Sequence, residues 1–512
     1  MAVTKPGRHE TATSVFSFAD PEEYARFRKV LLDAGFTAEG VLKTLGVQGP
    51  PAIRGNDLPV LLRRTRQGTP RDILIRLFLI EAPVEIEAVQ RAIRPMQLET
   101  LGQAGLVEID GSSVVAAVKL LPYDGLYVAF DLPRRLQEGM PDYVMGIGRS
   151  SITLANLTVR RNSTATLDLG TGCGIQALQA ARHSDHVFAA DLNPRAVSMA
   201  AFNAKLNNLH NMECVEGDLF APVAGKKFDL VISNPPFVIS PENQYIYRDG
   251  GMEGDELCRK IVREVPAFLN EGGFCQILCN WVEKAGQDWQ ARLADWFRGT
   301  GCDAWVMRSE TQDIETYATT WIRHTELHDT SEFAPRFEQW VRYYEGQGIH
   351  AMSAGVITMR RTERRTPWFR ADDAPRAMIG PAGEAIERGF ELYDFLETVR
   401  DDAALLGSRL LFSPDISLVR RLLPSSEGWQ EDAMTLSLNR GFSYSGEVDQ
   451  YVADILIACD GQNRLDQVIE KIAALPGIDP GTLKPTFCMV VRRLIEHGFL
   501  LPGQGKNSTV GQ

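Results

Sequence analysis

The sequence lacks closely spaced cysteines and long apolar runs. Its 8 cysteines include no Cys-x-x-Cys pair, and Cys275 and Cys279 would lie roughly 13 Å apart along a strand, too far for one metal ion or one disulfide. The pattern indicates free thiols in a reducing compartment and predicts no metal site. No segment reaches the ~18 apolar residues of a membrane span, and the polar start Met1–Glu10 is not typical of a signal peptide. We therefore expect a soluble, cytoplasmic protein.

Basic residues are also too few to balance the acidic ones. The chain has 54 Lys and Arg against 66 Asp and Glu, a net charge of −12, which disfavours long duplex nucleic acid by charge alone, although a local basic groove could still bind one. A content of 44% hydrophobic and 23% charged residues is that of a globular protein. The length of 512 residues predicts about three domains.

Two mainly helical regions are expected at the ends of the chain. Apolar residues recur at helical spacing from Pro21 to about Leu120, and Gly105 and the turn at Asp110–Gly111 then end a helix and cross a strand. A similar helix-to-strand pattern near Gly498 closes the chain. Both predict winged-helix-like domains, although any helix-to-strand turn favours glycine. The predicted segments are a loose N-terminus (1–18), a helical domain (19–120), a central domain (121–366), a linker (367–386), a second helical domain (387–502) and a loose tail (503–512).

Strands and helices alternate in the central domain, which predicts an α/β fold with a mostly parallel sheet covered by helices on both faces. The expected elements are Thr166–Leu169, Gln176–Arg182, His186–Ala190, Pro194–Leu206, Met212–Val215, Asp229–Ser233, Glu256–Leu269 and Gly273–Cys279.

A glycine turn joins the first strand to the first helix of this domain. It comprises Asp168, Leu169, Gly170, Thr171, Gly172, Cys173 and Gly174. Glycines at this position let the backbone turn sharply and approach a ligand closely. Gly172–Ala177 also satisfies the dinucleotide pattern Gly-x-Gly-x-x-Ala, so the turn alone leaves NAD open.

The next two strands end in acidic residues. Asp191 lies 21 positions beyond Gly170, where a carboxylate can accept both hydroxyls of an adenosine ribose. Asp218 follows the third strand and could accept from an adenine amino group, with Leu219 against the ring. Because NAD enzymes also bind adenosine, these features predict a nucleotide site without choosing the cofactor.

The fourth strand ends in Asn234-Pro235-Pro236-Phe237. The prolines fix φ and lack N–H groups, so the backbone carbonyls of the corner stay free to accept hydrogen bonds. The side-chain oxygen of Asn234 and such a carbonyl suit the two donors of a planar –NH2 group, and Phe237 could stack on a flat substrate. Accepting both hydrogens would aim the nitrogen lone pair at an electrophile by orientation and electrostatics, without a strong base.

These motifs resemble the class I S-adenosylmethionine-dependent methyltransferases of the amino-methylating branch. That branch includes protein-glutamine N5-, adenine N6- and ribosomal RNA guanine N2-methyltransferases. The later segment with Gly250, Gly251 and Gly254 is similar to the glutamine methyltransferases that act on translation release factors.

The resemblance implies a Rossmann-like domain and assigns roles to the motif residues. Asp168, Gly170, Thr171, Gly172, Cys173 and Gly174 would hold the methionine part of S-adenosyl-L-methionine, Asp191 and Leu192 the ribose, Asp218 and Leu219 the adenine, and Asn234, Pro235, Pro236 and Phe237 the substrate amide beside the cofactor. The family usually has Tyr where this sequence has Phe237.

The expected substrate is a protein or peptide glutamine. An exocyclic base amine of RNA or DNA and a small-molecule amine stay open, as does a non-catalytic module that only binds the cofactor. Tyr245, Tyr247 and Arg248 follow the corner and could form a lid over the substrate or a solvated loop. The arginines at 360, 361, 364 and 365 could meet a phosphate backbone or form a solvated hinge.

Overall fold

The computed structural model describes residues 16–47, 57–242, 245–325, 330–363, 365–375, 377–426, 428–473 and 480–503. The chain divides into two compact units. One comprises Met1–Leu154 and Arg161–Asp373, and the other comprises Ala155–Arg160 and Ala374–Gln512.

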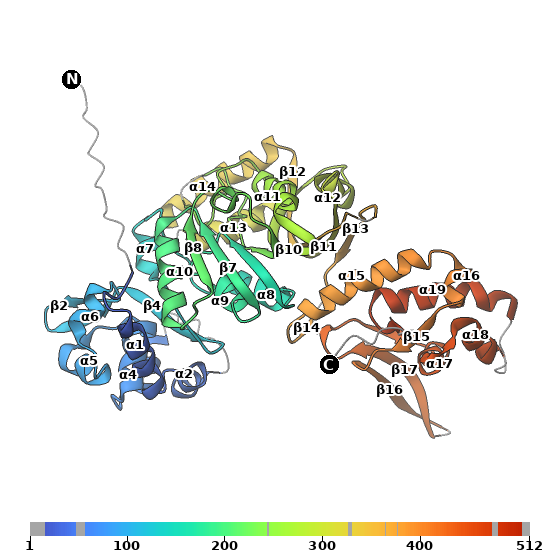
Figure 1. The fold of residues 1–512 in the computed structure, drawn as a ribbon, viewed down its shortest axis with the longest axis horizontal. Helices are drawn as coiled ribbons and strands as arrows, with labels where there is room; N and C mark the ends of the chain where they lie inside the picture. The colour runs from blue at the N-terminus through green and yellow to red at the C-terminus, as the bar shows by residue number, and fades with distance from the viewer. Residues whose placement is uncertain are drawn as a thin grey trace. The chain divides into compact units, whose positions relative to one another are not determined.

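An eight-stranded sheet forms the centre of the first unit (Figure 1), in the order β13-β11-β12-β10-β9-β6-β7-β8. Only β12 runs against the others. The predicted α/β class with a mostly parallel sheet is confirmed. The strands are β6 Ser163–Leu169, β7 Ser184–Asp191, β8 Met212–Glu216, β9 Phe228–Ser233, β10 Leu269–Lys284, β11 Cys302–Asp313, β12 Ile349–Arg361 and β13 Phe369–Asp373.

The strand order reverses direction beside β6. From β6 the chain moves outward to β7 and β8, and then returns to the other side of β6 through β9 and β10. The loops that follow β6 and β9 therefore separate, and an α/β sheet binds ligands in the crevice left at that point. Helices α9 (Ile175–Ala180), α10 (Pro194–Leu206) and α11 (Glu256–Glu264) follow β6, β7 and β9 along the chain.

Most predicted elements of the sheet region agree closely with the structure. Helix α10 has the predicted bounds, and the first four strands differ by no more than three residues at either end. The helix expected over Glu256–Leu269 ends at Glu264 and continues as a 3-10 turn, Val265–Phe268. Pro266 lies in that turn and has no N–H for an α-helical hydrogen bond.

The N-terminal helices pack on α9 and α10. They are α1 Glu22–Asp33, α2 Ala38–Leu45, α3 Leu58–Arg64, α4 Pro70–Ile75 with a π-helical continuation to Ile80, α5 Ile86–Ala92 and α6 Leu98–Gln103, followed by a small sheet in the order β1-β3-β2 (β1 Val84–Glu85, β2 Val107–Asp110, β3 Ser113–Ala116). The Phe18 and Phe202 rings lie 5.7 Å apart. One hydrophobic core contains residues of both regions.

A hairpin fastens this region to α10. It consists of β4 (Val118–Tyr123) and β5 (Leu126–Asp131), so the boundary expected between residues 120 and 121 falls inside β4. The Asn203 and Asn207 side chains on α10 each exchange hydrogen bonds with the backbone of β5, at 2.7–2.9 Å. Each side-chain amide accepts from one backbone N–H and donates to one backbone carbonyl along the edge of β5 that does not pair with β4.

A buried ion pair joins the end of this hairpin to α10. The Arg195 guanidinium donates to both carboxylate oxygens of Asp131, at 2.6–3.1 Å, and both side chains are almost completely buried. The same carboxylate accepts from the Val144 backbone N–H at 2.8 Å. Asp131 therefore connects the hairpin, α10 and the segment around Val144.

Two helices are inserted between β11 and β12, namely α13 (Ile314–Thr325) and α14 (Thr330–Gly346). Short helices α7 (Pro133–Gln137) and α8 (Arg149–Leu157) precede β6, and α12 (Trp289–Phe297) precedes β11.

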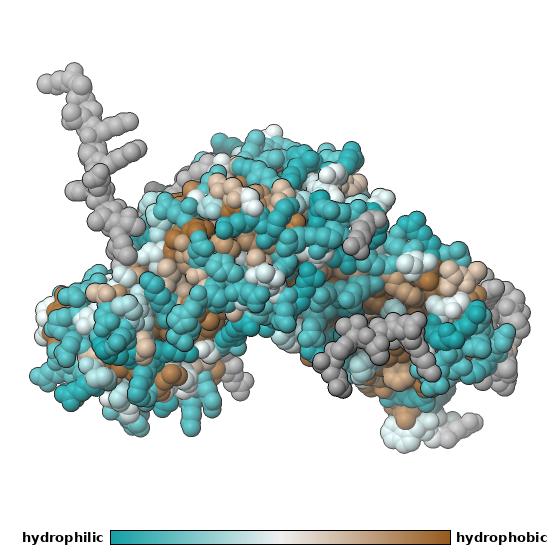
Figure 2. All heavy atoms as spheres, in the orientation of Figure 1, coloured by the Kyte–Doolittle hydropathy of each residue, from teal (hydrophilic) through white to brown (hydrophobic). Residues whose placement is uncertain are grey.

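The second unit contains more strand than the sequence predicted. Its helices are α15 Gly383–Thr398, α16 Asp402–Leu406, α17 Gln450–Ala458, α18 Leu465–Ala473 and α19 Pro480–Glu496; its three-stranded sheets are β20-β15-β21 (β15 Arg409–Phe412, β20 Asp460–Arg464, β21 Leu500–Pro502) and β16-β17-β19 (β16 Ile416–Ser425, β17 Gly428–Leu438, β19 Ser445–Val448). Leu422, Leu423 and Trp429 near the tip of the β16–β17 hairpin are exposed, and hydrophobic residues reach the surface in this part of Figure 2.

The predicted linker 367–386 differs from the structure. Its first part forms β13, which pairs with β11 in the central sheet, and its last residues begin α15. The prolines that suggested a linker flank these elements. In the described part of the chain, no helix is long and apolar enough to span a membrane.

Removing the Asp131 carboxylate should destabilise the first unit strongly. Asp131→Ala leaves the buried Arg195 charge without its partner, and we expect a loss of about 3–5 kcal/mol in the free energy of unfolding. Urea denaturation followed by fluorescence measures it. Asp33→Ala is the control, because Asp33 pairs with Lys29 at the surface of α1 and its loss should cost less than about 1 kcal/mol. Equal losses in the two variants would contradict the importance of the buried pair.

Candidate active site

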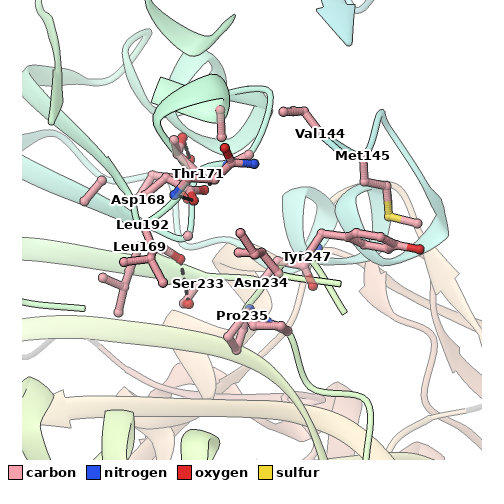
Figure 3. A pocket seen from close by; sticks show the side chains of 18 of the residues that line it. Val144, Met145, Asp168, Leu169, Thr171, Leu192, Ser233, Asn234, Pro235 and Tyr247 are labelled. Carbon is pink, nitrogen blue, oxygen red and sulfur yellow. Dashed lines mark hydrogen bonds between the residues drawn. The ribbon is translucent and has the colours of Figure 1, made fainter. Parts of the chain in front are cut away.

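A cavity of about 470 Å³ opens where β6, β7, β8 and β9 end (Figure 3). Its volume lies within the range of small-molecule sites, about 300–1,000 Å³. The cavity lining includes all of the predicted site residues except Gly174 and Phe237. Residues from four separate loops of the sequence therefore converge at the point where the strand order reverses.

The glycine turn after β6 forms one wall of the cavity. Gly170 and Gly172 adopt φ values of 73° and 55°, which strain any residue with a Cβ. Apart from the adjacent residues in the chain, no atom would lie within 4 Å of a Cβ added to either glycine. This part of the backbone therefore faces open space.

Gly174 has a different role from the one predicted. It does not line the cavity, and a Cβ there would lie 3.0 Å from the Cβ of Ala200. The glycine lets the start of α9 approach α10 closely. Its expected contact with the methionine part of a cofactor is therefore replaced by a role in helix packing.

Asp168 stabilises the conformation of the glycine turn through hydrogen bonds. One of its carboxylate oxygens accepts from the Thr171 hydroxyl at 2.6 Å and from the Ala177 backbone N–H at 3.0 Å. Burial raises the pKa of this carboxyl to about 7, against the lowering effect of these two hydrogen bonds. The side chain lines the cavity, where it can provide a negative charge for a positive ligand.

Asp191 lies at the end of β7, on the neighbouring side of the cavity. Its two oxygens accept from the backbone N–H groups of Gly172 and Asn193, each at 2.8 Å. Burial raises its pKa despite these hydrogen bonds. Each carboxylate oxygen keeps a further lone pair, so Asp191 can still accept from a ligand hydroxyl.

The turn after β8 places Asp218 and Leu219 at the cavity. Leu219 has φ = 46°, an unfavourable conformation for a residue with a Cβ, of the kind that concentrates at functional sites. The preceding Gly217 allows this turn, because a Cβ there would lie 2.9 Å from Cδ of Pro222.

Asn234 follows β9 and faces the glycine turn. The hydroxyl of Ser233 donates to the Leu169 carbonyl at 2.8 Å, which ties the end of β9 to the end of β6. The Asn234 Nδ2 donates to Ser150 Oγ at 3.3 Å, whereas its Oδ1 is buried and has no hydrogen-bond partner. Buried polar atoms are rarely left unpaired, so this oxygen provides an acceptor for an incoming donor. Because it is also covered, a ligand reaches it only when a neighbouring group shifts.

The segment with Gly250 and Gly251 packs beside the proline corner, and both residues line the cavity. The Val238 N–H donates to the Arg248 carbonyl at 3.2 Å. A Cβ on Gly250 would lie 3.0 Å from the Pro236 carbonyl oxygen, so glycine permits this close approach.

Phe237 was expected to stack on a flat substrate, but the structure packs its ring elsewhere. Its ring lies outside the cavity lining and meets Trp321 of α13 edge-on, with centroids 6.3 Å apart. Phe237 packs between two hydrophobic clusters, one of the central sheet and one of the α13–α14 insertion.

The α13–α14 insertion supports the loop after the corner. Tyr344 donates from its hydroxyl to the Ile239 carbonyl at 2.7 Å, and the Ile239 N–H donates to the Tyr317 hydroxyl at 3.1 Å. Both tyrosines are buried. This contribution was not predicted, because nothing in the periodicity of α13 or α14 indicates which loop they contact.

The segment after the corner is not a solvated loop. Tyr245 and Arg248 are buried, and Arg248 forms ion pairs with Asp249 at 2.7 Å and Glu242 at 3.4 Å. Arg248 is therefore structural, whereas Tyr245 and Tyr247 line the cavity. Tyr143 and Met145 on the facing segment also line it, and sequence analysis did not assign them.

The arginines that suggested a phosphate-binding cluster are engaged with other groups. Arg360 and Arg365 both bind the buried carboxylate of Asp303, at 2.7 and 2.5 Å. Arg361 contacts the Thr300 carbonyl and Glu363. Residue 364 lies outside the described residues. Among residues 330–363 and 365–375, these arginines bind groups beside the end of β12, an inner strand of the sheet, rather than lining an open basic groove.

The fold and the cavity define a Rossmann-like nucleotide-binding methyltransferase. The strand order, a glycine turn after the first strand, an aspartate after the second and an Asn-Pro-Pro corner after the fourth occur together at one cavity. The orphaned Asn234 Oδ1 beside that turn fits an amino-group acceptor next to the cofactor.

Comparison with known proteins agrees with this class. Residues 147–300 match the methyltransferase small domain family, and residues 33–117 and 387–502 each match a family described as a domain of unknown function. The chain is 37% identical over 136 residues to a protein of Methanocaldococcus jannaschii named "putative protein N5-glutamine methyltransferase". The aligned residues make up 25% of this chain and 68% of that protein.

Two further relatives carry related names. A release factor glutamine methyltransferase of Geobacter sulfurreducens is 29% identical over 199 residues, covering 30% of this chain and 70% of that protein. A ribosomal protein uL3 glutamine methyltransferase of Xylella fastidiosa is 33% identical over 139 residues, covering 25% of this chain and 44% of that protein.

The chain belongs to the protein N5-glutamine methyltransferase family of class I S-adenosylmethionine-dependent enzymes. It is an N-methyltransferase, and its cofactor is S-adenosyl-L-methionine. The resemblance inferred from the motifs is confirmed. The region that matches the methyltransferase family lies in the first unit except for Ala155–Arg160, and residues 33–117 and 387–502 match separate families.

Cofactor affinity should depend on the ionisation of Asp168. Because burial raises its pKa to about 7, the side chain is mostly neutral at pH 5.5 and mostly ionised at pH 7.5. The methionine part of the cofactor is positively charged, so we expect its Kd, measured by calorimetry, to fall roughly tenfold across this range.

Two comparisons test this dependence. In Asp168→Asn, most of the pH dependence of the cofactor Kd should be lost, and Asp191 should account for the remainder. An equally steep pH dependence of Kd in the variant would contradict the role assigned to Asp168. The stability of the free enzyme should change in the opposite direction, because the folded state binds the Asp168 proton more tightly than the unfolded state does. Neutral Asp168 therefore adds to the free energy of unfolding below about pH 4, and this contribution is lost as the pH rises through about 7.

Removing the Asp191 carboxylate should weaken cofactor binding without abolishing folding. We expect Asp191→Ala to cost about 2 kcal/mol of binding free energy, the scale of a lost pair of charge-assisted hydrogen bonds. Asp185→Ala on the exposed part of the same strand is the control. If calorimetry gave equal affinities for both variants, Asp191 would not hold the ribose.

Proposed function

We propose that the enzyme transfers a methyl group to the side-chain amide nitrogen of a glutamine in a protein substrate. The observation that carries this proposal is the buried, unpaired Oδ1 of Asn234 beside the cofactor cavity. The names of the relatives, which refer to glutamine in release factors and in a ribosomal protein, support the same acceptor.

Asn234 and the adjoining proline corner would orient the acceptor. An amide –NH2 has two donors, which Asn234 Oδ1 and a backbone carbonyl of the corner can accept. Two such hydrogen bonds hold the nitrogen in place and aim its lone pair across the cavity, toward the glycine turn. When bound there, the cofactor supplies an activated methyl group on its sulfonium. An amide nitrogen that has accepted a methyl group carries a positive charge and is strongly acidic, so one of its two protons can leave to water and the product is the neutral N-methyl amide.

This arrangement requires no strong general base. Among the described residues, no histidine or lysine lines the cavity, and burial raises the pKa of the Cys173 thiol to about 12. The Asp168 and Asp191 carboxylates are held by the backbone on the glycine-turn side of the cavity. Orientation and electrostatics therefore supply most of the expected rate enhancement.

The charge of the cavity favours a protein acceptor over a nucleic acid. In the part of the chain that the structure describes, no Lys or Arg lines the cavity, whereas Asp168, Asp191, Asp218 and Asp249 do. Phosphate backbones are attracted mainly by Lys and Arg, so this lining would repel them. At the rim, Met145, Leu192 and Ile246 are 46%, 55% and 39% exposed, which suits the apolar part of a peptide.

Removing the Asn234 amide should separate catalysis from cofactor binding. We expect Asn234→Ala to lower kcat at least about 100-fold, by analogy with the loss of one preorganised polar group at a reacting centre, while the cofactor Kd changes less than about threefold. Transfer of a tritiated methyl group to a glutamine-containing release-factor or ribosomal protein measures the rate.

The controls identify the acceptor as well as the residue. Asn439→Ala, at an exposed asparagine of the second unit, should leave the rate unchanged, and replacing the acceptor glutamine by asparagine or glutamate should remove the label. Label that ribonuclease releases and protease does not would refute the protein substrate. Unaltered turnover in Asn234→Ala would refute the role of the corner.

A further inference from the structure

The Phe237 ring packs against Trp321 and is not part of the cavity lining, whereas other aromatic residues line it. Three tyrosines, Tyr143, Tyr245 and Tyr247, line the same cavity. Tyr143 and Tyr245 are buried, whereas Tyr247 is partly exposed. Tyr247 is therefore the aromatic ring that an entering acceptor can reach.

The position of Tyr247 is fixed on two sides. Its ring meets Tyr143 edge-on with centroids 5.3 Å apart, and lies 5.7 Å from the ring of Tyr245. Figure 3 shows Tyr247 beside Met145, on the side of the cavity where Asn234 and Pro235 lie. The glycine turn, with Asp168 and Thr171, forms a separate wall in the same view.

The backbone around Tyr247 is tied to the catalytic corner. The N–H of Asp249 donates to the Tyr245 carbonyl at 2.9 Å, and the Tyr245 N–H donates to the Asp249 carboxylate at 3.1 Å, so a hydrogen-bonded turn encloses Tyr247. The Arg248 carbonyl accepts from Val238, directly after the corner. The distance between Tyr247 and Asn234 is therefore set by hydrogen bonds rather than by a free loop.

We propose that Tyr247, together with Met145, forms the wall of the acceptor slot and packs against the aliphatic stem that carries the reacting amide. This inference rests on the proposed function and names a specificity residue for it. An aromatic face and a thioether provide apolar contact for methylene groups without competing for the amide hydrogens. Burial raises the pKa of the Tyr247 hydroxyl to about 12, so the ring stays neutral at the pH of the assay.

The test compares Tyr247→Ala, Tyr247→Phe and Tyr247→Leu in the full-length enzyme, with a glutamine peptide from a release factor as acceptor. Tyr247→Ala should raise KM for the peptide about tenfold or more, with the cofactor Kd changed less than about twofold. Tyr247→Phe should stay within about threefold of the parent, and Tyr247→Leu should fall between them. Tyr451→Ala, an exposed tyrosine of the second unit, is the matched control.

Each outcome decides the inference. An unchanged KM in Tyr247→Ala, or an equal loss in Tyr247→Phe, would overturn a role for the ring. A cofactor Kd that weakens as much as KM would assign Tyr247 to the cofactor instead. If the parent enzyme labels RNA and no protein, the proposed function fails, and the same variants measured on that RNA then show separately whether Tyr247 contacts the acceptor.

Discussion

The site depends on the parallel pairing of β6 with β9. Its register places Leu169 opposite Ser233, and the Ser233 hydroxyl adds a hydrogen bond to the Leu169 carbonyl. The residues that follow these two strands are the glycine turn and Asn234. Cofactor and acceptor groups therefore meet because two central strands end side by side, whereas the loops beyond them are held by other contacts.

Those contacts come from parts of the chain that lie far from the motifs. The α13–α14 insertion holds both backbone groups of Ile239. Asp131, at the end of an N-terminal hairpin, binds the N–H of Val144 next to the cavity-lining Met145. The site thus consists of a few short loops that are held in place by contacts from distant parts of the chain.

The sequence predicted the central sheet well, because buried parallel strands appear as short apolar runs that end in glycine or polar residues. The Asp191, Asp218 and Asn234 positions followed from these strand ends. Phe237 could not be placed in the same way: the direction of its side chain depends on Trp321, about 80 residues away along the chain. Gly174 was assigned to a ligand because a glycine that permits helix packing has the same local signature as one that faces a cofactor. Strand β16 was missed because its apolar residues are mostly exposed and do not alternate with polar ones. Strand β17 was missed although Met434, Leu436 and Leu438 alternate as in a half-buried strand.

The shared core of the N-terminal helices with α9 and α10 has a consequence for any attempt to shorten the protein. A fragment that begins after the hairpin would present Phe202 and the Arg195 charge to solvent, and the amides of Asn203 and Asn207 would lose their strand. The minimal folding unit is therefore larger than the region that resembles other methyltransferases. In this chain, the N-terminal region is part of the scaffold of the enzyme and cannot be treated as a detachable accessory.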